Sequence, residues 1–102
     1  NTLVNSGRIN VTSPVWNSHG LYSNSANTKS INSGIINAVD TAVTASVYGA
    51  SGFYTDSSNN TLTNTGNISA TGSVNFAYAV YIRFATNFTL VNSSTISGTS
   101  TT

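Results

Sequence analysis

The feature that most constrains this chain is a short phrase that occurs four times along its 102 residues. Each copy has an Asn, then Ser or Thr, then Gly in three of the four copies, and an Ile four positions after the Asn. The copies are centred on Asn5, Asn32, Asn64 and Asn92, which are 27, 32 and 28 residues apart. Self-similarity at a period of about 20 to 50 residues is typical of solenoids, propellers and other repeat arrays.

Alignment of the copies on their Asn gives columns of like residues. The most regular column contains only isoleucine: Ile9, Ile36, Ile68 and Ile96. A polar residue follows each Ile, and a small or apolar residue follows that, which is the alternation of a half-buried strand with Ile facing inward. Two positions after the Asn stand Gly7, Gly34 and Gly66. Glycine at a fixed place beside Asn-Ser or Asn-Thr predicts a bend with positive φ.

A second, looser pattern of small, aliphatic and Tyr residues lies in the second half of each unit. It reads Gly20-Leu21-Tyr22, Ser46-Val47-Tyr48 and Ala79-Val80-Tyr81. We interpret these triplets as a further strand whose middle residue points inward and whose Tyr points outward. The second unit carries about five extra residues, which we place in a loop insertion at about 49–54.

The columns predict an all-β chain folded as a parallel β-helix, or β-solenoid, of about three to four coils. We expect residues 1–102 to form a single domain with irregular rungs of 27–32 residues that start near Asn5, Asn32, Asn64 and Asn92. In such a fold equivalent residues stack about 4.8 Å apart, giving an inner Ile ladder and an Asn ladder at the bend. A β-sandwich stays open as the alternative because turn signals are frequent, although it gives no reason for identical columns.

Phrases such as Thr61 to Gly72 and Gly20-Leu21-Tyr22 resemble the passenger repeats of bacterial autotransporters and of filamentous-haemagglutinin-type adhesins. The resemblance covers nearly the whole chain. It implies a right-handed parallel β-helix, export to the extracellular side or the bacterial cell surface, and a role in adhesion or in building an extracellular fibre.

Composition argues against several classes of partner. Asn, Ser and Thr fill 48 positions, while only 5% of residues are charged and the net charge is +1. Such a surface gives no electrostatic basis for binding nucleic acid or an anionic membrane. Cysteine is absent, which excludes disulfides and thiolate metal sites. No apolar run approaches the ~20 residues of a spanning helix.

The residues that could carry catalysis are few. His19 is the only histidine, the only acids are Asp40 and Asp56, and there is no Glu. A serine triad could be drawn with Ser18 or another serine, but nothing like a nucleophile elbow surrounds any of them. Paired-carboxylate hydrolysis and a protein-supplied metal site both lack ligands. We therefore expect no enzyme activity, no cofactor and no metal, and we interpret His19 as an exposed turn residue.

Tyr22, Tyr48 and Tyr81 form the column most open to a functional interpretation. The interpretation that we favour is a stacked Tyr ladder that stiffens the wall. The alternative is a strip that stacks on sugar rings or packs against another solenoid. Aromatic residues in the expected loops are candidates for the same contacts: Trp16, Phe53 and Tyr54. Three sequons are candidate glycosylation acceptors, with Asn59 expected at a loop tip: Asn59, Asn10 and Asn87.

The chain starts and finishes with a copy of the strand phrase, and neither end shows a capping segment. Bare solenoid ends expose unpaired backbone groups that invite strand addition. Either the chain belongs to a longer protein, or its ends dock head to tail on further copies. The sequence thus predicts a non-enzymatic extracellular structural protein that stacks end to end or forms part of an adhesin. The alternative is a module that binds a carbohydrate or a receptor through the Tyr strip.

Overall fold

The computed structural model describes residues 1–45 and 49–101, and every regular element in these two ranges is a β-strand. The strands form three parallel sheets, which are the three walls of a solenoid. The first wall contains β1 (Thr2–Asn5), β4 (Lys29–Asn32), β7 (Thr61–Asn64) and β10 (Thr89–Asn92). The second contains β2 (Arg8–Ser13), β5 (Ile35–Asp40), β8 (Asn67–Gly72) and β11 (Thr95–Ser100). The third contains β3 (Ser18–Ser23), β6 (Ala50–Thr55) and β9 (Ala77–Ile82).

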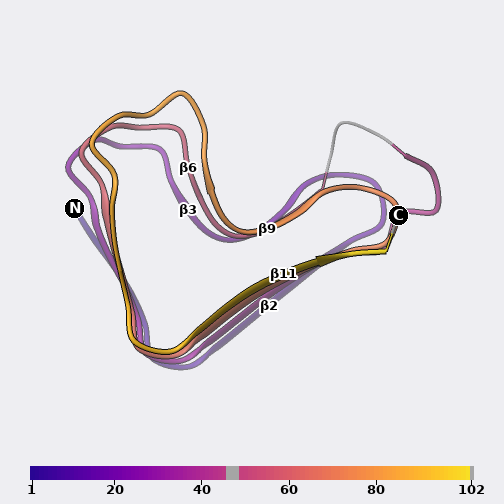
Figure 1. Ribbon diagram of the computed structural model, residues 1–102, viewed down its shortest axis with the longest axis horizontal. Coiled ribbons are helices and arrows are strands. Elements are labelled where there is room, and N and C mark those ends of the chain that lie inside the picture. Colours follow the sequence, from indigo (N-terminus) through magenta and orange to yellow (C-terminus); the bar gives the residue numbers. More distant parts are fainter. Residues whose placement is uncertain (46–48, 102) are drawn as a thin grey trace.

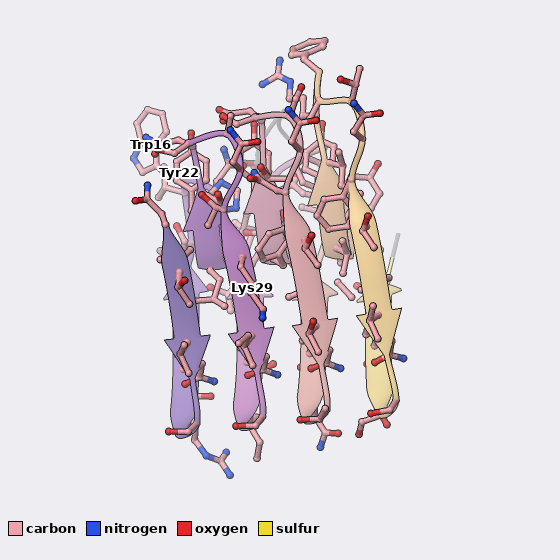
Figure 2. The ribbon with its side chains drawn as sticks, turned by 90° about the vertical axis from the view of Figure 1, so that its left-hand side faces the viewer. Trp16, Tyr22 and Lys29 are labelled. Atoms are coloured by element: carbon pink, nitrogen blue, oxygen red, sulfur yellow. The ribbon has the colours of Figure 1, made fainter. Side chains whose placement is uncertain are left out.

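Successive coils lie directly on one another along the short axis of the molecule (Figure 1), whose extents are 36 × 27 × 17 Å. In this view the chain runs counterclockwise while it advances toward the viewer, so the solenoid is right-handed. Figure 2 shows the four strands of the first wall side by side, with Lys29 on its outer face. The predicted right-handed parallel β-helix of three to four coils is confirmed.

The register of the strands follows the sequence columns. In the first wall Asn5 pairs with Asn32, Asn32 with Asn64, and Asn64 with Asn92. In the second wall the four isoleucines stack in the same way. A shift of one residue would move every inward side chain to the outer face, and the repeated alternation of the columns therefore fixes this pairing.

The core is the stack of inward side chains from the middle coils. Ile36, Ile68, Leu62 and Phe53 are fully buried and contact one another across the three walls. Ile9 and Ile96 occupy the same column but are only half-buried, because each has a neighbouring coil on one side alone. Burial is thus complete inside the stack and partial at its ends.

Two of the three glycines of the phrase, Gly34 and Gly66, are required for a reason other than the predicted one. Among the described residues no glycine has positive φ, so the expected left-handed bend at Gly7, Gly34 and Gly66 is wrong. A Cβ on Gly34 would instead lie 2.0 Å from Gly7 O, and a Cβ on Gly66 would lie 2.0 Å from Gly34 O. The first three coils approach so closely at this corner that only glycine fits at positions 34 and 66, whereas the fourth coil has Ser94 there.

Asparagine takes the left-handed conformation at another corner. Asn27, Asn59 and Asn87 have φ of 59, 60 and 56°, and each lies two residues before a strand of the first wall. Asn tolerates this backbone region better than other residues with a Cβ. The corner between the third and first walls is therefore made by Asn.

The predicted loop insertion at about 49–54 is also wrong. Residues 50–55 form β6, and all six of them are buried. The extra residues of the second coil lie before this strand: nine residues (41–49) separate β5 from β6, whereas the first and third coils have four (14–17 and 73–76) at that place.

The third wall bends inward toward the second (Figure 1), and small residues make this possible. A Cβ on Gly20 would lie 2.2 Å from Ile36 Cγ2, and a Cβ on Gly52 would lie 2.3 Å from Ile68 Cγ2. Glycine inside a strand commonly marks such a close approach. The bend leaves His19 and Tyr22 on the outer side of the third wall, while Leu21 and Phe53 pack against the core.

Candidate functional site

The first candidate feature is the Asn ladder at the corner between the first and second walls. Asn5 Nδ2 donates to Asn32 Oδ1, Asn32 Nδ2 to Asn64 Oδ1, and Asn64 Nδ2 to Asn92 Oδ1, each at 2.8 Å. Asn32 and Asn64 are fully buried. Each rung has the same polarity, so the ladder has a donor end and an acceptor end.

The ladder also closes the corner within each coil. The side-chain amide donates to the carbonyl two residues further on, at 3.2 Å from Asn32 to Gly34 O and 2.8 Å from Asn64 to Gly66 O. Only a primary amide supplies two N–H donors and an acceptor at one site. This double use explains why Asn stands in all four copies.

The outer edges of β1 and β10 are the second candidate feature. Lys29 N donates to Asn1 O and Ser33 N to Asn5 O, each at 2.9 Å. Backbone direction alternates along a strand, so the amide and carbonyl of Val4 face away from the second coil. At the other end Thr89 N and Ser93 N donate to the third coil. The backbone groups of the alternate residues of β10 therefore face away from the stack.

The third feature is a continuous set of rings on the outer side of the third wall, here called the aromatic surface. It consists of His19, Tyr22, Tyr54, Phe76, Tyr78 and Tyr81. Tyr54 is at its centre, with ring centroids 4.6 Å from His19, 5.0 Å from Tyr22 and 5.2 Å from Tyr81. Tyr78 joins Tyr81 at 4.8 Å and is stacked on Phe76 at 4.9 Å.

The aromatic surface only partly matches the predicted Tyr column. Strand pairing places Tyr54, not Tyr48, between Tyr22 and Tyr81, and Tyr48 lies outside the described residues. The insertion precedes β6, so the true triplet of the second coil is Gly52-Phe53-Tyr54. The Tyr periodicity holds in the structure, but the extra residues before β6 move the Tyr of the second coil from position 48 to position 54.

His19 is a member of this surface and is not an exposed turn residue as predicted. It lies within β3, and its ring is stacked on Tyr54 with an interplanar angle of 18°. Burial lowers the pKa of His19 below its ordinary value, because desolvation disfavours the charged imidazolium. Burial therefore favours the neutral form of the stacked imidazole.

Both acids of the chain are bonded to neighbouring groups. Asp56 Oδ2 accepts from the Tyr22 hydroxyl at 2.8 Å. This hydrogen bond, helped by burial and by the charge of Asp56, raises the pKa of Tyr22. Asp40 is buried, and its two oxygens accept from Ala42 N at 2.9 Å and from Asn75 Nδ2 at 2.7 Å. The structure thus uses these carboxylates to fix turns and side chains.

The remaining predicted contact residues are scattered. Trp16 is exposed in the turn before β3, whereas Phe53 is fully buried in the core and Tyr54 is only 8% exposed. The expectation that Phe53 and Tyr54 lie in a loop is therefore wrong. The candidate glycosylation residues Asn10, Asn59 and Asn87 are all exposed; Asn59 lies at a corner between two strands, and its Oδ1 accepts from Asn87 Nδ2 at 3.1 Å.

No family model, curated protein or solved structure shows significant similarity to this chain. Residues 1–45 and 49–101 include no helix long and apolar enough to cross a membrane. They also bring together no group of three or more His, Asp, Glu or Cys side chains that could hold a metal ion.

Proposed function

We propose that this chain is a non-enzymatic structural unit that extends a β-solenoid end to end. In this proposal it builds an extracellular fibre or forms part of an adhesin at a bacterial cell surface. One observation carries it: β1 and β10, the two edge strands of the first wall, have the same sequence, Thr-Leu-Val-Asn. A second copy placed on the end of the stack would therefore meet a strand identical to the one at its own start.

The polarity of the Asn ladder supports the same arrangement. Asn92 Nδ2 donates to Ser94 O at 2.8 Å, and Asn5 Oδ1 accepts from Gly7 N at 3.3 Å. A primary amide has a second N–H, and its oxygen has a second lone pair. Asn92 of one copy can thus donate to Asn5 of the next copy, and the ladder would continue without a change of direction.

Apolar side chains at the two ends supply the contact area. Val4 is 64% exposed at one end, and Leu90 and Val91 are 44% and 53% exposed at the other. When β1 lies on β10 and β2 on β11, leucine covers leucine and Ile9 covers Ile96. Burying such side chains stabilises association by about 25 cal/mol per Å² of apolar area.

The contact between copies is made by two of the three walls. The third wall has three strands where the others have four. In this stack β9 of one copy and β3 of the next are separated by about two strand spacings, roughly 9.6 Å. Hydrogen bonds between copies therefore form along the first and second walls.

The non-enzymatic part of the proposal is supported by composition and by the use of the acids. The chain has one His, two Asp and no Glu or Cys, and both acids have structural partners. Its hydroxyl- and amide-rich surface and its resemblance to adhesin passenger repeats support the extracellular location.

The experiment that tests stacking replaces Val4 with proline. The Val4 amide faces away from the second coil, so Val4→Pro removes a donor needed only between copies, and proline is tolerated at such edges. The matched control Val4→Thr keeps the amide and the β-branched shape. Electron microscopy and sedimentation of the unmodified chain should show fibres with an axial repeat of about four strand spacings, roughly 19 Å.

Val4→Thr should assemble in the same way, and Val4→Pro should remain monomeric with an unchanged circular dichroism spectrum. An unmodified chain that stays monomeric at millimolar concentration would refute end-to-end stacking. Fibres of Val4→Pro as long as those of the control would refute the assigned edge.

A further inference from the structure

The aromatic surface points to a second activity that does not depend on stacking. It lies on the outer side of the third wall, where the inward bend at Gly20 and Gly52 leaves Tyr and His side chains on both sides of the bend. Tyr22 and Tyr78 are 47% and 45% exposed. Core packing does not require a connected set of six rings on the outside of a wall.

The rings are held rigidly. Tyr54 is 8% exposed and is in contact with His19, Tyr22 and Tyr81. Tyr22 is fixed at its other end by the hydrogen bond to Asp56. A surface whose side chains are already ordered loses little conformational entropy when a ligand binds. Tyr22 and Tyr78 therefore present preformed, partly exposed aromatic faces.

Polar groups accompany the rings. The Asp56 carboxylate is exposed and can accept from hydroxyl donors. His19 Nδ1 and Ser51 Oγ are buried polar atoms with no hydrogen-bond partner among the described residues. Unpaired buried polar atoms of this kind are costly. Both belong to the strand positions that run beside the Tyr column, since His19 pairs with Ser51 and Ser51 with Tyr78.

The charges near the surface balance. Asp56 is followed one coil later by Arg83, whose guanidinium lies 4.6 Å from the centre of the Phe84 ring, and burial lowers the pKa of His19. An uncharged ligand with apolar ring faces and many hydroxyls fits this combination better than an anion or a cation. Pyranose sugars have this chemistry.

The spacing of the rings indicates an extended oligosaccharide. From one coil to the next the ring centroids are 5.0 Å apart from Tyr22 to Tyr54 and 5.2 Å apart from Tyr54 to Tyr81. One sugar of an extended β-linked hexopyranose chain advances by a similar distance. We propose that the aromatic surface binds an uncharged, linear, β-linked hexopyranose chain that runs obliquely across the coils from Tyr22 in the first to Tyr78 in the third, with sugar faces stacked on these two exposed rings.

The test is isothermal titration calorimetry with cellohexaose as the probe. The unmodified chain should bind cellohexaose, and Tyr22→Ala and Tyr78→Ala should each weaken binding at least tenfold. Phe84→Ala is the matched control, because Phe84 is an 87% exposed aromatic residue outside the surface, and its binding should equal that of the unmodified chain. Circular dichroism should show that all three variants are folded.

Two comparison sugars test the ligand class. Maltohexaose has the same composition but a curved α-linked backbone, and an oligogalacturonate carries negative charge; both should bind at least tenfold more weakly than cellohexaose. The proposal is overturned if the unmodified chain does not bind cellohexaose at millimolar concentration. It is also overturned if maltohexaose binds equally well, or if the two Tyr variants bind as tightly as Phe84→Ala. Titrating the monomeric Val4→Pro chain separates this result from the result for stacking.

Discussion

Replacing Gly34 with alanine tests the close approach of the coils directly. The new Cβ would lie 2.0 Å from Gly7 O and 2.8 Å from Ser6 C, and contacts below 3.0 Å are essentially never formed by real Cβ atoms. The colliding atoms are backbone, so no side-chain rotation relieves the clash. The second coil must move by about 1 Å or more, which stretches the bonds from Gly34 N to Asn5 O (3.3 Å) and from Ile35 N to Gly7 O (2.8 Å).

The expected loss of stability follows from these contacts. Overpacking costs about 1–3 kcal/mol, and each weakened hydrogen bond costs about 0.5–1.5 kcal/mol. The reduced entropy of the unfolded chain offsets about 0.4–1 kcal/mol of this. Gly34→Ala should therefore lower the free energy of unfolding by about 2–4 kcal/mol. A domain of this size has a total of about 5–15 kcal/mol, so the change is large but measurable.

Gly7→Ala is the matched control within the same phrase. Gly7 is in the first coil, its Cβ would meet nothing within 4 Å, and its φ is not positive. Alanine there should be neutral or should stabilise the fold by up to about 1 kcal/mol. Urea unfolding, followed by circular dichroism at a concentration where the chain is monomeric, gives both values. Equal stability of the two variants would refute the claim that close approach selects glycine.

Three further predictions concern the core, the ladder and pH. Ile68→Ala should lower the free energy of unfolding in urea by about 2–5 kcal/mol. Ile96 is half-buried in the last coil, so Ile96→Ala should lower it by less than half as much. Equal losses would contradict the assigned core. Asn64→Ala should lower the free energy of unfolding by about 1–3 kcal/mol, because it leaves buried hydrogen-bond partners unpaired. Asn92 is exposed, so Asn92→Ala should change it by no more than about 0.5 kcal/mol. A larger loss for Asn92→Ala than for Asn64→Ala would be inconsistent with the ladder. Burial lowers the pKa of His19 from 6.5 in the folded chain. Below pH 6.5 the unfolded chain therefore binds a proton that the folded chain does not bind. The free energy of unfolding should decrease as the pH falls from 6.5 to the pKa of the folded chain. His19→Gln should reduce that slope in urea titrations at a series of pH values, and an unchanged slope would exclude His19 as its source.

Much of the fold could be predicted because the same physical constraint repeats in every coil. The Asn and Ile columns stand at equal offsets from each other in all four copies. In a stack each such position meets its own equivalent, so identical residues at equal offsets determine both the register and the inward face. The structure confirms both columns, from Asn5 to Asn92 and from Ile9 to Ile96.

The third wall was harder to predict because its constraint is not local. Two triplets could follow the second Asn phrase, one ending at Tyr48 and one ending at Tyr54. The number of residues from the Asn favours Tyr48, because that triplet needs no insertion before its strand. Packing favours the triplet 52–54 instead, because it brings Gly52 against Ile68 and Phe53 into the core. That preference depends on the distance between walls, which the local pattern does not contain. For the same reason the local pattern does not predict that Tyr54 and His19 belong to the aromatic surface.

The repeated columns also raise the question of what sets the order of the coils. If every corner has the same Asn, an edge strand cannot distinguish the next coil of its own chain from the first coil of another copy. Inside the chain, connections of about 30 residues hold the correct neighbour at high effective concentration. Under the proposed stacking, the identical sequences of β1 and β10 would make a second copy an equivalent neighbour. Because stability in a repeat stack is a sum over interfaces, the junction between copies should resemble an internal interface that lacks one wall. Under the proposed stacking, the columns that make the fold predictable are therefore the same ones that would pair the last coil of one copy with the first coil of the next.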